Sequence, residues 1–274
     1  MTADDLRGRP AALIVGHPGH ELRVHRWLEL ARPTVHVITD GSGRTGRSRL
    51  PSTDTVLART GASRGAVFGV WSDAAIYRIL LEGDGSPVLA LVNTLAESLA
   101  GVDYVVADAL EGFNPSHDLC RLIVNAAIDR AARRTGRALG NYDVLLDGDP
   151  RDCPEHLRAD AVQLRLDDDD LARKIDAALG YAELRGETER ALAAFGRDAF
   201  RIETLRPVRD PREGVDGLAE DPPYYERYGA QQVAAGHYDD VIRYRAHVQP
   251  IARLLWRDAA AAGGAHVTVS GTSA

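Results

Sequence analysis

The chain of 274 residues has few cysteines, no excess of positive charge and no long hydrophobic run. Two cysteines do not make a disulfide framework, and we expect Cys120 and Cys153 to be reduced thiols. A formal net charge of -7 argues against a broad nucleic-acid surface. No apolar stretch approaches the ~20 residues of a membrane-spanning helix, and the polar N-terminus leaves no room for a secretory leader. We therefore expect a cytoplasmic protein that acts on a small molecule, without nucleic-acid or membrane partners; a homo-oligomer stays open.

Short apolar runs alternate with helical stretches over most of the sequence. Strand-like runs lie near residues 11–16, 34–39, 66–70, 104–107 and 142–146. This alternation predicts an α/β fold with a doubly wound, mostly parallel sheet and helices on both faces. We place the α/β domain in residues 1–207. Residues 208–274 are expected to form a C-terminal loop and helical extension that packs on the same domain.

The segment after the first predicted strand carries two histidines and a carboxylate. The apolar run 11–16 is followed by the sequence HPGHE at residues 17–21, and a helical pattern comes next. Two neutral imidazoles three residues apart on such a turn can converge on one cation. The alternative is that His17 and His20 are solvated loop residues.

A third donor is available in a second loop of similar design. The sequence NPSH at residues 114–117 follows the strand-like run 104–107 and precedes a helical stretch. In an open parallel sheet, loops at the carboxyl ends of strands converge on the ligand crevice. We therefore expect His117 to join His17 and His20 around a divalent metal.

The two loops together resemble those of the PIG-L/LmbE family of zinc-dependent N-deacetylases, which read AHPDDE and HPDH. The matching segments here are GHPGHE at residues 16–21 and NPSH at residues 114–117, and the resemblance covers most of residues 11–207. It implies an LmbE-like, Rossmann-like fold and Zn²⁺ held by His17, His20 and His117, a three-His set in place of two His and one Asp. It also implies that Arg49 faces the substrate.

Two positions depart from the family pattern. Gly19 stands where the family has the aspartate that acts as general base, and Asn114 stands where it has a histidine that supports the oxyanion. An amide can still donate a hydrogen bond to an oxyanion. Glu21, Asp118 and Asp40 are the candidates for proton transfer. Structural roles for these three, at helix ends or in orienting a ligand histidine, stay open.

The region after residue 207 contains aromatic and charged residues that suit a sugar-like ligand. Three tyrosines lie within residues 222–229, and flat rings beside charged groups are typical of sites for hydroxyl-rich rings. Tyr225 and Arg243 are our candidate substrate-binding residues there. Residues 237–248 are predicted to form a helix on which Arg243 and His247 share a face, with an intrahelix or intersubunit ion pair of Arg243 as the alternative to substrate binding.

Three functions are compatible with these features. The first is a metal-dependent amide hydrolase, similar to the N-deacetylases, that acts on an N-acylated sugar or a related small biosynthetic intermediate with Zn²⁺, Fe²⁺ or another divalent metal. The second is a three-His metalloenzyme of another reaction type, such as Fe(II)-dependent redox or lyase chemistry. The third is a catalytically silent relative that binds a sugar-like ligand.

Overall fold

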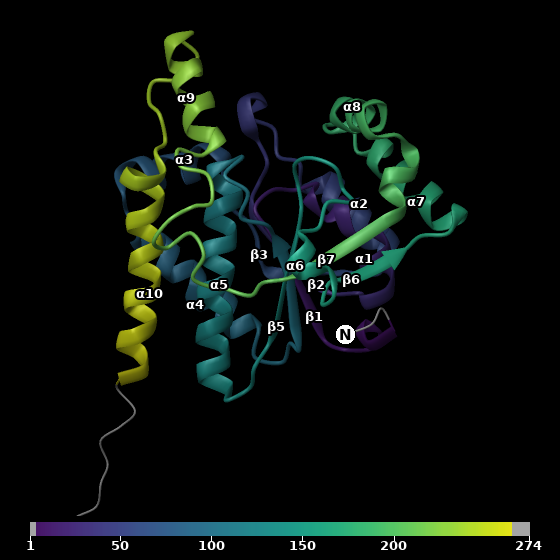
Figure 1. Cartoon of the computed structure of the whole chain (residues 1–274), viewed down its shortest axis with the longest axis horizontal. Coiled ribbons are helices and arrows are strands. Elements are labelled where there is room, and N and C mark those ends of the chain that lie inside the picture. The colour runs from purple at the N-terminus through teal and green to yellow at the C-terminus, as the bar shows by residue number, and fades with distance from the viewer. Residues whose placement is uncertain (1–3, 265–274) are drawn as a thin grey trace, which may run out of the picture.

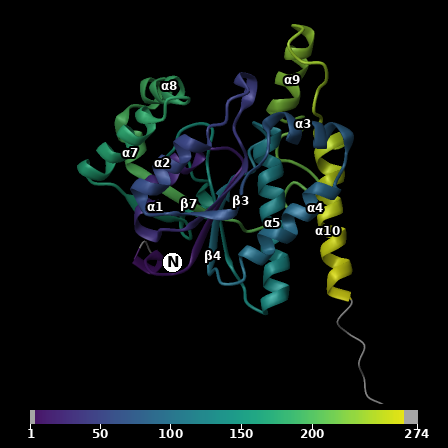
Figure 2. The same cartoon turned by 180° about the vertical axis from the view of Figure 1, so that it is seen from behind.

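A mixed seven-stranded β-sheet runs through the centre of the computed structural model, which describes residues 4–264, with helices on both sides (Figures 1 and 2). The strands are β1 (Ala11–Val15), β2 (Thr34–Thr39), β3 (Ser63–Trp71), β4 (Tyr104–Asp108), β5 (Gly140–Val144), β6 (Val162–Arg165) and β7 (Ile202–Pro207). Their order in the sheet is β3-β2-β1-β4-β5-β7-β6. Strands β1 to β5 pair in parallel, whereas β7 is antiparallel to both β5 and β6. The predicted α/β class with a mostly parallel sheet is confirmed, and the antiparallel edge is an addition to it.

Local capping residues set the ends of several of the α-helices. The α-helices are α1 (His25–Ala31), α2 (Leu50–Thr60), α3 (Asp73–Glu82), α4 (Ser86–Ser98), α5 (Pro115–Thr135), α6 (Glu155–Arg158), α7 (Asp168–Gly180), α8 (Arg185–Phe195), α9 (Tyr224–Ala234) and α10 (Gln249–Gly264). In α5 the Asn114 side chain accepts the N–H of Ser116, Pro115 opens the first turn, and left-handed Gly136 ends the helix. In α7 the Asp167 side chain caps the first turn.

Alternate residues of the central strands point to opposite faces of the sheet. Along β1, Ala12 and Ile14 join the apolar core under α3, α4, α5 and α10, while Leu13 and Val15 join the core under α1, α2 and α7. A strand that is covered on both faces needs a continuous apolar sequence, which β1 has. Within residues 4–264, no helix is both long enough and apolar enough to cross a membrane.

The C-terminal segment packs against α5, and α10 runs alongside that helix (Figure 1). Its buried residues Tyr225, Tyr244 and Ile251 belong to the same apolar core as α5. The prediction of a helix over residues 237–248 is wrong for its first half. Residues 237–243 are irregular, and a single turn of π-helix, η5 (Tyr244–Val248), leads into α10. Residues 265–274 of the predicted extension lie outside the described residues.

Hydrogen bonds from the backbone to side chains explain why the helical segment begins at Tyr244 and not at residue 237. The ring Nδ1 of His247 accepts the backbone N–H of Arg243 (2.8 Å), and the Glu226 carboxylate accepts the N–H of Tyr244 (3.2 Å). Arg243 itself has extended backbone angles (φ -110°, ψ 135°). Because these backbone donors are satisfied by side chains, the helix begins after Arg243.

Candidate metal centre

The two predicted histidine loops leave neighbouring strands at the same edge of the sheet. Strands β1 and β4 pair directly, although β2, β3 and their helices separate them in the chain. The chain proceeds from β1 toward β2 and β3 on one side, and from β4 toward β5 on the other. Such a reversal of direction opens a crevice beyond the carboxyl ends of the two strands. The HPGHE segment (17–21) and the NPSH segment (114–117) both lie there.

His17, His20 and His117 come together at this edge. Their ring centroids are 5.4 Å apart for His17 and His20, 5.3 Å for His17 and His117, and 4.6 Å for His20 and His117. Two imidazoles bound to one zinc ion at tetrahedral angles, with Zn–N bonds of about 2.0 Å, have centroids about 5 Å apart. The separation of the rings therefore suits three ligands of one divalent ion.

Two of the three rings are oriented by buried polar groups. The Nδ1 atom of His20 lies 3.0 Å from a carboxylate oxygen of Asp108, which also accepts the N–H of Gly16 (2.7 Å). The Nδ1 atom of His17 lies 2.8 Å from the hydroxyl of Thr39 and 3.2 Å from a carboxylate oxygen of Asp73. Carboxylates that bind one ring nitrogen of a histidine leave the other nitrogen for a metal, an arrangement found at most histidine metal sites.

Burial keeps the imidazoles in the form that binds metals. Desolvation lowers the pKa of His17 and lowers that of His117 well below its ordinary value, and the neighbouring rings lower both further. Both histidines are therefore neutral at neutral pH, and only a neutral imidazole has a lone pair to donate. The Nδ1 atom of His117 is buried without a hydrogen-bond partner. This nitrogen is therefore available as a metal ligand.

The donor atoms themselves do not close around one point. Within residues 4–264, no group of three or more His, Cys, Asp or Glu side chains is positioned to hold a metal ion. The rings thus have the separation of a metal site, and rotations about side-chain torsions would have to complete its donor geometry. The three imidazoles, the oriented Nδ1 atoms of His17 and His20 and the unpaired nitrogen of His117 fit a divalent metal.

Each of the four predicted catalytic residues accepts a hydrogen bond from a nearby backbone N–H through its side chain. Asn114 caps α5, and a carboxylate oxygen of Asp40 accepts the N–H two residues further on (2.9 Å). The Glu21 carboxylate accepts the N–H of Gly19 (2.7 Å), and one oxygen of Asp118 accepts two backbone N–H groups of the 111–112 turn (3.1 Å each). The structure thus gives each of the four a structural role at the rim of the candidate centre.

Glu21 and Asp118 are fully buried, and each has a second carboxylate oxygen without a partner. Desolvation raises the pKa of both carboxyl groups, and that of Asp118 rises to about 7. Hydrogen bonds from the backbone oppose the rise in both cases, because they stabilise the ionised form.

A side chain at Gly19 would collide with a neighbouring leucine. A Cβ atom built at this position would lie 2.1 Å from Cδ1 of Leu184, and Gly19 has a left-handed φ of 107°. Leu184 lies in the turn between α7 and α8 and packs beside the buried Tyr181. An aliphatic side chain therefore occupies the space that a side chain at position 19 would need.

A cleft of about 760 Å³ opens onto the three-histidine edge. Its lining includes His20, His117 and Arg49, together with residues of α7 and α8 and the aromatic rings of Phe113 and Tyr228. In Figure 1, α9 and the pair α7–α8 rise on opposite sides beyond the sheet edge. The structure thus brings Arg49 to the cleft, where its Nε also donates to the carbonyl oxygen of Gly41 (2.6 Å).

The other two predicted substrate-binding residues lie elsewhere. Tyr225 is buried in the α5 core, and its hydroxyl has no partner. Arg243 forms an ion pair with Glu226 of α9 (3.0 Å), within the chain but between two elements, rather than the intrahelix or intersubunit pair that the sequence left open. The tyrosine that reaches the cleft is Tyr228. Residues 224 and 228 are one helical turn apart, so Tyr224 and Tyr228 share a face of α9, while Tyr225 turns inward.

Sequence reasoning missed several residues that shape the centre. Asp108 is the last residue of β4, and Asp73 opens α3 directly after β3. A carboxylate immediately after an apolar strand run was the available signal for Asp108, because that position faces the crevice. For Leu184 there was no such signal, since its contact with Gly19 depends on how α7 and α8 fold back over the sheet edge.

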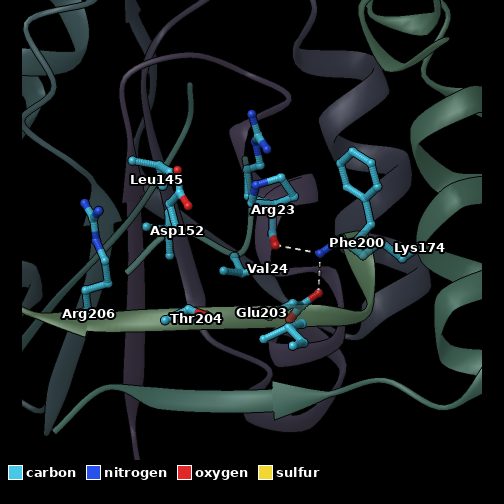
Figure 3. Close-up of a pocket in the computed structure, with 12 residues that line it drawn as sticks. Arg23, Val24, Leu145, Asp152, Lys174, Phe200, Glu203, Thr204 and Arg206 are labelled. Atoms are coloured by element: carbon cyan, nitrogen blue, oxygen red, sulfur yellow. Dashed lines mark hydrogen bonds and ion pairs between the residues drawn. The ribbon is translucent and has the colours of Figure 1, made fainter. Parts of the chain in front are cut away.

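A second cavity, of about 20 Å³, has room for about one water molecule (Figure 3). It lies beside a buried ion pair between Lys174 of α7 and Glu203 of β7, whose N–O distance is 2.9 Å. Lys174 also donates to the carbonyl oxygen of Arg23 (2.8 Å). Its desolvated ammonium group thus ties α7 to β7 and to the turn η2 (His20–Val24), which contains His20.

Comparison of this chain with family models, with functionally described proteins and with solved structures finds no match.

Proposed function

We propose that this protein is a metal-dependent amide hydrolase with an LmbE-like site, which acts on an N-acylated small molecule in the cytoplasm. One observation supports the proposal above all others: three imidazoles from two distant loops converge where β1 and β4 end, and the carboxylates of Asp73 and Asp108 orient two of them. Both cysteines are free thiols, which fits a reducing compartment.

His17, His20 and His117 would hold the cation, with Zn²⁺ as the first choice. When bound by three neutral ligands, a divalent ion polarises a carbonyl group and lowers the pKa of water. Asp73 and Asp108 hold the rings of His17 and His20 in place through their Nδ1 atoms. Water adds to the acyl carbon, and the C–N bond breaks to give a carboxylic acid and an amine.

Arg49 and the aromatic rings provide for substrate binding. The guanidinium of Arg49 lies in the cleft near His20 and His117. It has only hydrogen-bond donors, so it can donate to a carbonyl or hydroxyl oxygen of the substrate. Phe113, Tyr224 and Tyr228 form a stack, with centroids 5.2 and 5.8 Å apart and interplanar angles of 3° and 20°. Such exposed ring faces suit the apolar face of a sugar-like ring.

The proposal is tested by amine release. Purified protein loaded in turn with Zn²⁺, Co²⁺ or Fe²⁺ is incubated with N-acylglucosamines of several chain lengths, with and without oxygen, and the free amine is measured. We expect metal-dependent, oxygen-independent release of amine from the wild type and its loss in His117→Ala. Turnover that requires iron and oxygen would favour the second reaction type. Tight binding of one metal ion without any amine release would contradict the hydrolase assignment.

A further inference from the structure

We infer that the cleft binds an aliphatic acyl chain of the substrate directly beside the three imidazoles, so that the preferred substrates are N-acyl compounds with chains much longer than acetyl. This inference rests on the proposed function and specifies its substrate class. It starts from Leu184, the side chain that fills the space next to Gly19.

Apolar side chains line the wall of the cleft beside the histidines. Leu184 lies against Gly19, which precedes His20, and further aliphatic and aromatic lining residues come from α7, α8 and neighbouring segments. These apolar lining residues are Leu22, Leu146, Ile175, Ala178, Leu184, Ala191, Leu192 and Phe200, and the charged residues Arg23, Arg49, Asp147, Lys174, Glu187 and Arg190 line other parts of the same cleft. Burial of alkyl groups against such a surface is favourable, and each buried methylene adds to affinity.

Hydrogen bonds and an ion pair within the protein hold this apolar wall in place. The Tyr181 hydroxyl lies 3.0 Å from the hydroxyl of Thr53 in α2 and donates to the carbonyl oxygen of Arg49 (3.1 Å). The ion pair between Lys174 and Glu203 fixes the middle of α7 to β7 (Figure 3). Because α7 is anchored at both places, its apolar face is preformed, and little ordering is required when a chain binds.

The two halves of an amide substrate differ in polarity, and this assigns the wall to the acyl half. Hydrolysis gives an amine, which is cationic at neutral pH and is poorly placed against leucine side chains. The reacting carbonyl carbon belongs to the acyl half, so the first methylene groups of the acyl chain lie next to the metal centre. Gly19 and Leu184 line the cleft on the His20 side and provide an apolar surface for them, whereas Arg49 and the ring of Phe113 also line the cleft and suit the polar half. The volume of about 760 Å³ lies within the range of sites for extended ligands.

The binding of straight-chain carboxylates tests the inference independently of turnover. Calorimetry measures the affinity of the purified protein for butanoate, hexanoate, octanoate and decanoate, both as isolated and after treatment with a chelator. We expect the affinity to rise by roughly two- to fourfold for each added methylene group in both preparations. An affinity that does not change with chain length would overturn the inference. In that case amine release from N-acetylglucosamine would still support the hydrolase.

Two variants locate the chain on the wall. In Leu184→Asn we expect a weaker dependence on chain length, whereas Leu81→Asn, a change at an exposed leucine of α3 outside the cleft, leaves the dependence unchanged. Ala191→Phe adds bulk to the lining without introducing a polar group. We expect this change to weaken the binding of decanoate more than the binding of butanoate. Circular dichroism verifies that each variant is folded. Equal behaviour of the Leu184→Asn and Leu81→Asn proteins, together with an unchanged chain-length profile in Ala191→Phe, would contradict the assignment of the wall.

Discussion

The carboxyl edge of the sheet and the C-terminal segment carry similar residues with different outcomes. At the sheet edge, His17 and His20 bind the carboxylates of Asp73 and Asp108 through Nδ1 and lie beside His117. In the C-terminal segment, Arg243 pairs with Glu226, and His247 accepts a backbone N–H at the start of a helix. The comparison teaches that the place in the topology, rather than the residue type, decides which polar side chains remain available for a ligand.

The largest expected difference between the two regions is in catalysis. We expect His117→Ala to lower kcat/KM for amide hydrolysis by more than about a hundredfold, because loss of a direct ligand exceeds the typical cost of losing its supporting partner. His247→Ala changes only a local hydrogen bond, and its kcat/KM should stay within about twofold of the wild type. Steady-state amine release compares the two variants. Similar losses in both would remove the distinction between the regions.

Carboxylates that support histidines should matter only at the sheet edge. Asp108→Asn weakens the interaction that orients His20, and we expect the affinity for Zn²⁺ to fall by about ten- to a hundredfold. The matched change in the C-terminal segment is Glu226→Gln, which disturbs the pair with Arg243 and should leave the Zn²⁺ affinity unchanged. Competition with a chromophoric chelator measures both affinities. An unchanged affinity in Asp108→Asn would contradict this role of the carboxylate.

Introducing a carboxylate at position 19 should destabilise the protein. Gly19→Asp places a Cβ against Leu184 and an L-residue at a φ of 107°, at a cost of about 1–3 kcal/mol in the free energy of unfolding. Gly217→Asp is the control in the C-terminal segment, because an added Cβ there meets nothing within 4 Å. Urea unfolding measures both. With Leu184→Ala in the background, the cost of Gly19→Asp should become smaller, and strictly additive effects would argue against the steric contact.

The smallest expected effect is a pH dependence that belongs to neither region. His36 of β2 is buried, and burial lowers its pKa to about 4, so the unfolded chain binds a proton more readily than the folded one. Stability is therefore lost as the pH falls below about 6.5, by about 1 kcal/mol between pH 7 and pH 5.5. In His36→Leu this part of the pH dependence should disappear. Urea unfolding at the two pH values measures the loss. An equal loss of stability in the wild type and in His36→Leu would contradict the assignment.

Much of the fold is predictable from the sequence, because local patterns determine it. The apolar run of β1 and the capping residues Asn114 and Asp167 act within a few residues of themselves. The antiparallel pairing of β7 with β5 and β6 depends on chain reversal over long distances, and no local pattern encodes it. The late start of the last helix was missed because Glu226, distant in sequence, binds the backbone of Tyr244.

The candidate site is predictable in part. The three histidines follow from strand-end positions, since parallel strands deliver their loops to one edge. The second predicted group, Tyr225 and Arg243, relied on residue type, and the structure places these residues in a core and in an ion pair. The contact of Leu184 with Gly19 arises from the packing of α7 and α8, so the apolar character of the cleft could not be read from the HPGHE loop alone.

The central claim is that His17, His20 and His117 bind one divalent cation. Its most direct test is the metal content of the wild type and of each single alanine variant after dialysis against Zn²⁺ and removal of the free ion, with His247→Ala as the control. We predict one Zn²⁺ per chain in the wild type and in His247→Ala, and loss of the ion in His17→Ala, His20→Ala and His117→Ala. A wild type that retains no stoichiometric metal, or a His20→Ala protein that retains it fully, would contradict the claim.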